Sequence, residues 1–185
     1  NYSQKPQRYH LYDMLKPFCE QVFISCNELQ LKDIEKGYRF LVDIPAWQNT
    51  GPIAALLTAF DHYPENNFIL IGCDYPFIAA DEITLFLKNC ESGKTTVFYN
   101  EKEDMYEPLL AFYHNVIKES LMEMAQKTQH SLQELLVKSN AGKYYPANKK
   151  SIIGVNTRKD LIEAYKLLDL LKIENKVQIV MKSGT

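Results

Sequence analysis

The chain has 185 residues, of which 46% are hydrophobic and 24% are charged, and its formal net charge is −2. These values are typical of one globular domain with a sizeable core. No long basic stripe is present, which argues against sequence-independent binding to nucleic acid. No apolar run approaches the roughly 18 residues that a membrane span requires.

The cysteines form no Cys-x-x-Cys pair, and no pair of histidines stands near them at the spacing of zinc ligands. They are Cys19, Cys26, Cys73 and Cys90. No secretory signal is visible in the sequence, which opens on Asn1. Because reduced thiols are typical of cytoplasmic proteins, we predict free thiols and a cytoplasmic location.

Hydrophobic periodicity predicts helices and strands that alternate over most of the length. In chain order they are a helix at 7–18, strands at 21–26 and 39–43, a helix from Pro52, a buried strand at 68–71, a helix at 81–89, strands at 95–100 and 108–114, helices near 115–126 and 131–138, a helix capped by Thr157 and Asp160, and a last strand at 176–182. This order predicts an α/β fold: a mostly parallel sheet with helices on both faces, within one domain over 1–185.

Asp74 follows the predicted strand at 68–71, and Asp43 ends the strand at 39–43. Ligands of such sheets bind beyond the carboxyl ends of the strands, so the two aspartates could face one crevice. An aspartate there can hold Mg²⁺, which takes only one or two protein carboxylates when a substrate supplies phosphate oxygens. A turn or a helix cap is the alternative role for Asp74. Its position in the sequence leaves both roles open.

Four segments, taken in order, resemble the molybdenum cofactor guanylyltransferases. They read TGPIAALLTAF at 50–60, FILIGCDYPFI at 68–78, EPLLAFYH at 107–114 and VNTRKDL at 155–161. The opening segment at 1–27 also resembles the first helix and second strand of that family. The resemblance implies a Rossmann-like nucleotidyltransferase fold. It also implies transfer of GMP from GTP to the phosphate of molybdenum-molybdopterin, with release of pyrophosphate.

The resemblance implies roles for individual residues. Asp74 matches the aspartate that binds Mg²⁺, and is the expected catalytic residue. Asn156 matches an asparagine near the metal. The positions that match contacts to the nucleotide are Ser25, Asn27, Asp43, Gly51 and Pro52. Ser25 and Gly154 depart from the family, which often has asparagine at both places. The implied cofactor is Mg²⁺. The implied partners are GTP, molybdopterin and other proteins of molybdenum cofactor biosynthesis, with neither nucleic acid nor a membrane.

One part of the family pattern is missing from the sequence. The family begins with a strand and a glycine-rich loop that cradles the triphosphate with backbone N–H groups and a cation. The segment YSQKP at 2–6 resembles the part of the family that comes directly after that loop. We therefore expect the strand and the loop to precede Asn1.

Two other functions stay open at this point. One is a cytidylyl- or sugar-phosphate nucleotidyltransferase on the same scaffold, and the other is a non-catalytic nucleotide-binding module. Three further residues carry smaller predictions. Glu107 either lines the acceptor pocket or is a solvated charge, His114 makes a structural hydrogen bond, and Trp47 anchors its loop to the core.

Overall fold

The structure is a computed structural model that describes residues 5–47, 50–127, 131–155, 157, 159–160, 162–164 and 166. The helices are α1 (Gln7–Leu15), α2 (Glu28–Leu31), α3 (Pro52–His62), α4 (Ala80–Lys88), α5 (Lys118–Gln126) and α6 (Leu132–Lys138). The strands are β1 (Ile24–Cys26), β2 (Phe40–Val42), β3 (Phe68–Ile71), β4 (Thr96–Asn100), β5 (Met105–Tyr113) and β6 (Gly142–Tyr144). Short 3₁₀ helices lie at Pro45–Trp47, Asn115–Ile117 and Lys149–Ile152.

The described strands form two sheets where the sequence predicted one. β1 and β2 pair in parallel, and the larger sheet has the order β3-β5-β4-β6. β5 is antiparallel to both β3 and β4, while β6 is parallel to β4. It follows that β3, β4 and β6 run in one direction and β5 runs against them. The predicted α/β class is confirmed. In the larger sheet, three of the four strands run in the same direction, and β5 is the exception to the predicted parallel arrangement. The short strand β6 and the one-turn helix α2 were not predicted.

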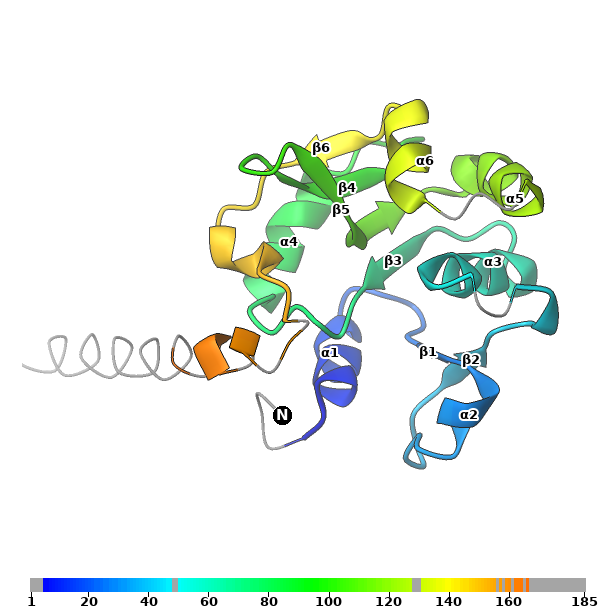
Figure 1. Cartoon of the computed structure of the whole chain (residues 1–185), viewed down its shortest axis with the longest axis horizontal. Helices are drawn as coiled ribbons and strands as arrows, with labels where there is room; N and C mark the ends of the chain where they lie inside the picture. Colours follow the sequence, from blue (N-terminus) through cyan, green and yellow to red (C-terminus); the bar gives the residue numbers. More distant parts are fainter. Residues whose placement is uncertain are drawn as a thin grey trace, which may run out of the picture.

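Helices cover both faces of the larger sheet, as predicted (Figure 1). Successive side chains of a strand point to opposite faces. Accordingly Val97 of β4 packs with residues of α3, α5 and α6, whereas Phe98 packs with residues of α1 and α4. The rings of Phe98 and Phe86 of α4 lie 4.6 Å apart between centroids. Trp47 packs against the first of these clusters, which confirms its predicted anchoring role.

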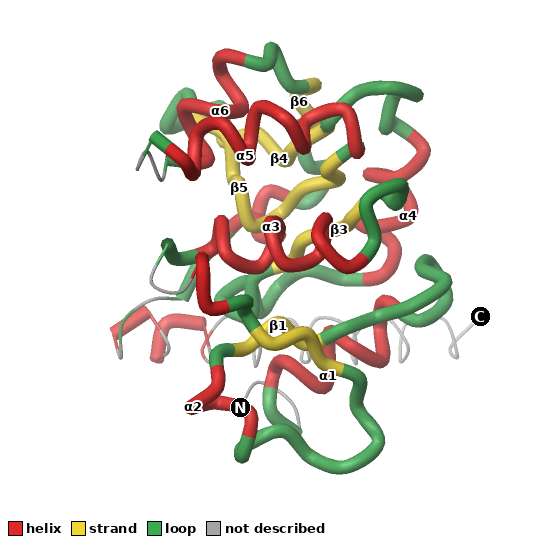
Figure 2. Tube along the Cα trace, turned by 90° about the vertical axis from the view of Figure 1, so that its right-hand side faces the viewer, coloured by secondary structure: helices red, strands yellow, loops and turns green. Residues whose placement is uncertain are grey.

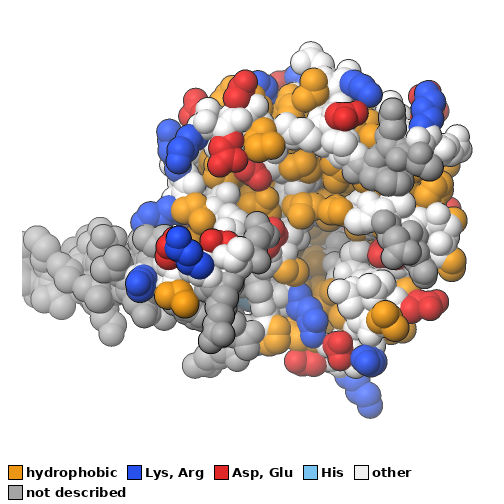
Figure 3. Space-filling model, viewed as in Figure 1, with side chains coloured by type: hydrophobic (Ala, Val, Ile, Leu, Met, Phe, Trp, Pro, Cys, Tyr) orange, Lys and Arg blue, Asp and Glu red, His pale blue; other side chains and the backbone are white. Residues whose placement is uncertain are grey.

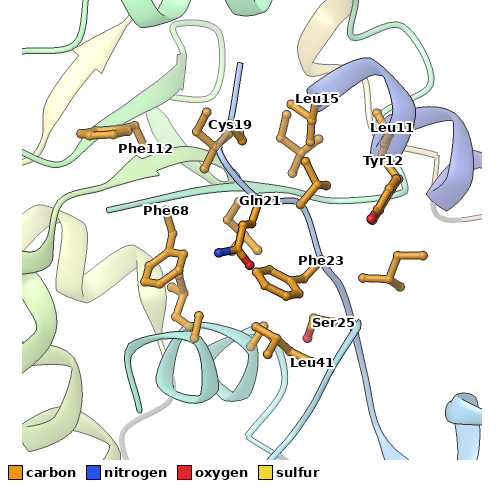
Figure 4. Close-up of a pocket in the computed structure, with 18 of the residues that line it drawn as sticks. Leu11, Tyr12, Leu15, Cys19, Gln21, Phe23, Ser25, Leu41, Phe68 and Phe112 are labelled. Atoms are coloured by element: carbon orange, nitrogen blue, oxygen red, sulfur yellow. The ribbon is translucent and has the colours of Figure 1, made fainter. Parts of the chain in front are cut away.

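An apolar cleft of about 620 Å³ separates the smaller sheet from β3. The two sheets lie apart in Figure 2, and hydrophobic side chains line a hollow in the middle of the face shown in Figure 3. Phe23, next to β1, and Phe68 of β3 approach the cleft from opposite sides (Figure 4). Contrary to the prediction of a buried strand, all four residues of β3 are only half-buried. The reason is that β3 is an edge strand whose free side borders this cleft.

Three smaller predictions can be compared with the structure. No helix among the described residues is long and apolar enough to cross a membrane. All the cysteines are free thiols, as predicted. The N–H of Thr157 donates to Asp160 Oδ2 at 2.8 Å, and the N–H of Asp160 donates to Thr157 Oγ1 at 3.2 Å, which confirms the predicted cap. The predicted strand at 176–182 lies outside the described residues.

Candidate active site

Asp74 lies in the turn between β3 and α4, beside a glycine that leaves room for its carboxylate. A Cβ atom at Gly72 would overlap Asp74 Oδ1 and would also lie 3.2 Å from Leu109 Cβ. The carboxylate is half-buried, and burial raises its pKa above the ordinary value. The backbone carbonyl of Asp74 accepts a hydrogen bond of 2.8 Å from the N–H of Val155. Asp74 is thus held by its backbone, while its carboxylate receives a backbone hydrogen bond and none from a side chain of the described residues.

A second acidic side chain, Glu107 of β5, lies near Asp74. Tyr75 Oη donates to Glu107 Oε2 at 2.9 Å, and Asn100 Nδ2 donates to Glu107 Oε1 at 3.2 Å. Burial raises the pKa of Glu107, the two hydrogen bonds oppose that increase, and the negative charges of Glu103 and Asp74 add to it. Glu107 is therefore a half-buried, hydrogen-bonded carboxylate and not a freely solvated charge.

Ser25 and Asp43 are brought together by the pairing of β1 with β2. The parallel register places Cys26 opposite Val42, so both strands end at the same edge. Asp43 follows there, and its N–H donates to the carbonyl of Cys26 at 2.9 Å. Ser25 Oγ donates to Asp43 Oδ1 at 3.3 Å. Burial raises the pKa of Asp43, and the hydrogen bond from Ser25 partly opposes this.

Asn27 has a structural role that the sequence reasoning missed. Its Oδ1 accepts from the N–H of Gln30 at 2.9 Å, and the Gln30 side chain accepts from the N–H of Asn27 at 3.0 Å. This reciprocal arrangement is a capping box at the start of α2. The pattern Asn-x-x-Gln at 27–30 was the signal that could have revealed it.

Gly51 and Pro52 form the start of α3, with Gly51 at a positive φ of 66° and Pro52 at the first helical position. Pro52 and Ser25 line the cleft, as do Gly72, Cys73 and Arg8. The cleft therefore reaches the carboxyl ends of both β1 and β3. Asn156 lies outside the described residues.

The arrangement near Asp74 fits a metal held mainly by its substrate. The described residues contain no group of three or more His, Cys, Asp and Glu side chains that could hold a metal ion. An all-protein cage is thus not formed by this part of the chain. Mg²⁺, however, usually takes one or two carboxylates and completes its shell with water and phosphate oxygens. Asp74 can supply one such carboxylate, with Glu107 nearby.

His114 was predicted to make a structural hydrogen bond, and its Nδ1 accepts from the N–H of Val116 at 3.3 Å. This bond caps the 3₁₀ helix at Asn115–Ile117. Sequence reasoning missed Tyr75, whose hydroxyl donates a hydrogen bond to Glu107. Nothing in the segment CDYP at 73–76 indicates that its tyrosine has a partner on β5.

Comparisons with known proteins agree with this architecture. A protein of Bacillus mycoides (strain KBAB4), named probable molybdenum cofactor guanylyltransferase, is 28% identical over 169 residues, covering 85% of this chain and 81% of that protein. The crystal structure of molybdopterin-guanine dinucleotide biosynthesis protein A from Archaeoglobus fulgidus superposes with a TM-score of 0.66 at 18% identity, covering 86% of this chain and 85% of that one. The crystal structure of 2-C-methyl-D-erythritol 4-phosphate cytidylyltransferase from Thermus thermophilus superposes with a TM-score of 0.62 at 12% identity, covering 86% of each chain.

The two structural likenesses confirm the predicted Rossmann-like nucleotidyltransferase fold. The model of one protein family, described as the MobA-like NTP transferase domain, matches residues 1–142. The chain therefore belongs to the MobA-like NTP transferase domain family.

Proposed function

We propose that this protein transfers GMP from GTP to the phosphate of molybdopterin in molybdenum cofactor biosynthesis and releases pyrophosphate. The observation that carries the proposal is the half-buried carboxylate of Asp74 beyond the carboxyl end of β3, next to Gly72 and Glu107. The name of the Bacillus mycoides relative, a probable molybdenum cofactor guanylyltransferase, supports the choice of nucleotide and acceptor.

The reaction is an in-line displacement at the α-phosphorus of GTP. An oxygen of the acceptor phosphate forms the new bond to the α-phosphorus, while the bond to the oxygen that bridges to the β-phosphate breaks, and pyrophosphate leaves. Mg²⁺, when bound, neutralises charge on the phosphates. The protein mainly positions the reactants and stabilises charge in such transfers, and Asp74 has the position and charge to hold the metal.

The nucleotide base is assigned to the edge where β1 and β2 end. Ser25 and Asp43 lie there within hydrogen-bond distance of each other. A carboxylate accepts hydrogen bonds, and the Watson–Crick edge of guanine offers the N1–H and the N2 amino group as donors. Asp43 is thus a suitable partner for guanine, and the proposal gives Ser25, Asn27, Gly51 and Pro52 supporting contacts to the nucleotide.

We further propose that a β-strand from a segment preceding Asn1 occupies the cleft between β1 and β3. Each of these strands is paired on one side among the described residues, β1 with β2 and β3 with β5. Their other sides border an apolar cleft of about 620 Å³. An added strand would satisfy backbone groups on both edges and bury the apolar walls. A loop after that strand would reach Gly72 and Cys73, beside Asp74, where its N–H groups could hold the triphosphate.

Two preparations test the strand proposal: residues 1–185 alone, and the same chain with its encoded upstream residues. We expect the longer protein to unfold at a higher urea concentration and to protect the backbone N–H groups of β1 and β3 from hydrogen exchange. Equal exchange of β1 and β3 in the two preparations would refute the added strand.

The function is tested with the longer protein, molybdopterin, Mg²⁺ and each of GTP, CTP and UTP, by measuring pyrophosphate release. We expect release that requires both the acceptor and GTP. Faster release with CTP would assign the protein to a cytidylyltransferase. Binding of nucleotide without any release would favour the non-catalytic module.

A further inference from the structure

The carboxylate of Glu82 is buried and is surrounded by donors from a single distant segment. Glu82 lies in the first turn of α4 with 3% of its surface exposed. Its Oε1 accepts from Tyr144 Oη at 2.7 Å and from the N–H of Ala147 at 3.0 Å. Its Oε2 accepts from the N–H of Asn148 at 2.8 Å and from Ser151 Oγ at 3.5 Å. All the donors belong to residues 144–151.

The arrangement depends on the charge of Glu82. A buried carboxylate is costly unless donors replace its hydration, and hydrogen bonds to a charged acceptor are stronger than neutral ones. No basic side chain forms an ion pair with Glu82 in the described part of the chain. Two of the donors are backbone N–H groups, which would be left unpaired if the carboxylate were lost. The Glu82 carboxylate thus joins this segment to α4.

The same segment reaches Asp74 at its other end. After the 3₁₀ helix at Lys149–Ile152, the N–H of Val155 donates to the carbonyl of Asp74 at 2.8 Å. Glu82 follows Asp74 in the chain through the turn 75–79. Residues 144–155 are therefore attached at both ends to residues 74–82, and Ile152 packs against the apolar cluster that contains Tyr144 and Ile78.

We propose that Glu82 is a positioning residue that holds residues 144–155 against the turn of Asp74. Its role rests on the proposed function, because the segment it holds donates a hydrogen bond to the backbone of Asp74, the residue to which the metal is assigned. Glu82 itself is assigned no contact with substrate. It acts through Val155, which contacts the backbone of Asp74.

The test compares wild type with Glu82→Gln and with the matched control Asp81→Asn, using the protein with its upstream residues. Glutamine keeps the shape of glutamate but removes the charge and replaces one acceptor oxygen by an amide donor. Asp81 is exposed in the same turn, and its side chain accepts only from the N–H of Glu82 among the described residues, a bond that asparagine can keep. The control therefore removes one charge from the same place without removing the contacts to 144–151.

Hydrogen exchange and Mg²⁺ titration of transfer are measured for each protein. In Glu82→Gln we expect the N–H groups of Ala147, Asn148 and Val155 to exchange faster by about tenfold or more, since a charged acceptor has been lost. We expect β4 and β5 to keep their wild-type exchange. Half-maximal transfer should require several-fold more Mg²⁺, and excess Mg²⁺ should restore part of the rate. Asp81→Asn should match wild type in both measurements.

Two results would overturn the positioning role. One is faster exchange at Ala147 and Asn148 with Val155 and the Mg²⁺ requirement unchanged, which would confine the effect of Glu82 to its direct donors. The other is uniformly faster exchange across β4 and β5, which would make Glu82 a general stabiliser. If the N–H of Val155 exchanges faster in Glu82→Gln but the wild type shows no transfer, the proposed function fails while the positioning of the segment by Glu82 stands.

Discussion

The hydroxyl of Tyr75 donates a hydrogen bond of 2.9 Å to Glu107 Oε2, which joins the turn after β3 to the neighbouring strand β5. This bond places a second carboxylate next to Asp74 and orients it. Burial raises the pKa values of Asp74 and of Glu107. Neither carboxylate forms an ion pair with a basic side chain of the described residues. Such a site is suited to a divalent ion that arrives with a phosphorylated substrate.

Asp74→Asn should abolish transfer without weakening the fold. Removing the charge that holds Mg²⁺ should lower the rate by about a hundredfold or more, as losses of a single charge-stabilising group typically do. Because burial raises the pKa of Asp74 in the folded protein, its ionised form opposes folding at neutral pH. The variant should therefore have an equal or higher free energy of unfolding at pH 7, measured by urea titration.

The pH dependence of that stability difference has a definite sign. The stabilisation from the raised pKa is fully present below the ordinary value of 3.8 and is lost as pH rises through the folded value. The advantage of Asp74→Asn over wild type should therefore shrink as the pH falls towards 3.8. An advantage that grows on acidification would show that Asp74 is not a burial-destabilised carboxylate.

Tyr75→Phe should lower the free energy of unfolding by about 1–3 kcal/mol at pH 7, because it removes a hydrogen bond to a half-buried carboxylate. Urea unfolding measures this change. Tyr63→Phe is a suitable control, since Tyr63 donates no side-chain hydrogen bond within the described residues. Equal effects of the two substitutions would mean that the contact with Glu107 contributes no stability.

Gly72→Ala should displace the Asp74 carboxylate, because the added Cβ would overlap Oδ1. Leu109 Cβ and Tyr75 Cε2 would each be 3.2 Å away, so the neighbours leave little room for relief. We expect a loss of stability of about 1–3 kcal/mol, as for other overpacked positions, together with a higher Mg²⁺ requirement for transfer. If Gly72→Ala kept the wild-type Mg²⁺ dependence, Gly72 would not be needed to position the Asp74 carboxylate.

The protein with its upstream residues should bind GTP more tightly than CTP or UTP. A site built to pair with the donors of guanine leaves buried acceptors unpaired when cytosine enters, at about 1–3 kcal/mol for each group. Two such groups give a preference on the order of a hundredfold. Calorimetric titration with each nucleotide and Mg²⁺ measures it. Equal affinities of the wild type for the three nucleotides would refute the guanine assignment. Ser25→Ala should reduce the preference for GTP, because it removes the hydrogen bond to Asp43.

The sequence predicted most elements because their patterns are local. Periodicity located the longer strands and every described helix except α2 and the short 3₁₀ helices, and strand-end positions singled out Asp43 and Asp74 as candidate site residues. The division into two sheets was not predictable, because it depends on what lies between β1 and β3. The contacts of Glu82 were missed for a similar reason. Its donors lie 62–69 residues away in the chain, and a glutamate in the first turn of a helix looks like an ordinary exposed charge.

The central claim is attack on the α-phosphorus of GTP by the molybdopterin phosphate. The most direct measurement follows two radiolabels, one in the α-phosphate and one in the γ-phosphate of GTP, during turnover by the protein with its upstream residues. We predict that the α label becomes attached to molybdopterin and the γ label leaves in pyrophosphate, and that both events are slower by about a hundredfold or more in Asp74→Asn. Transfer of the γ label to the acceptor, or release of both labels without attachment, would contradict this claim.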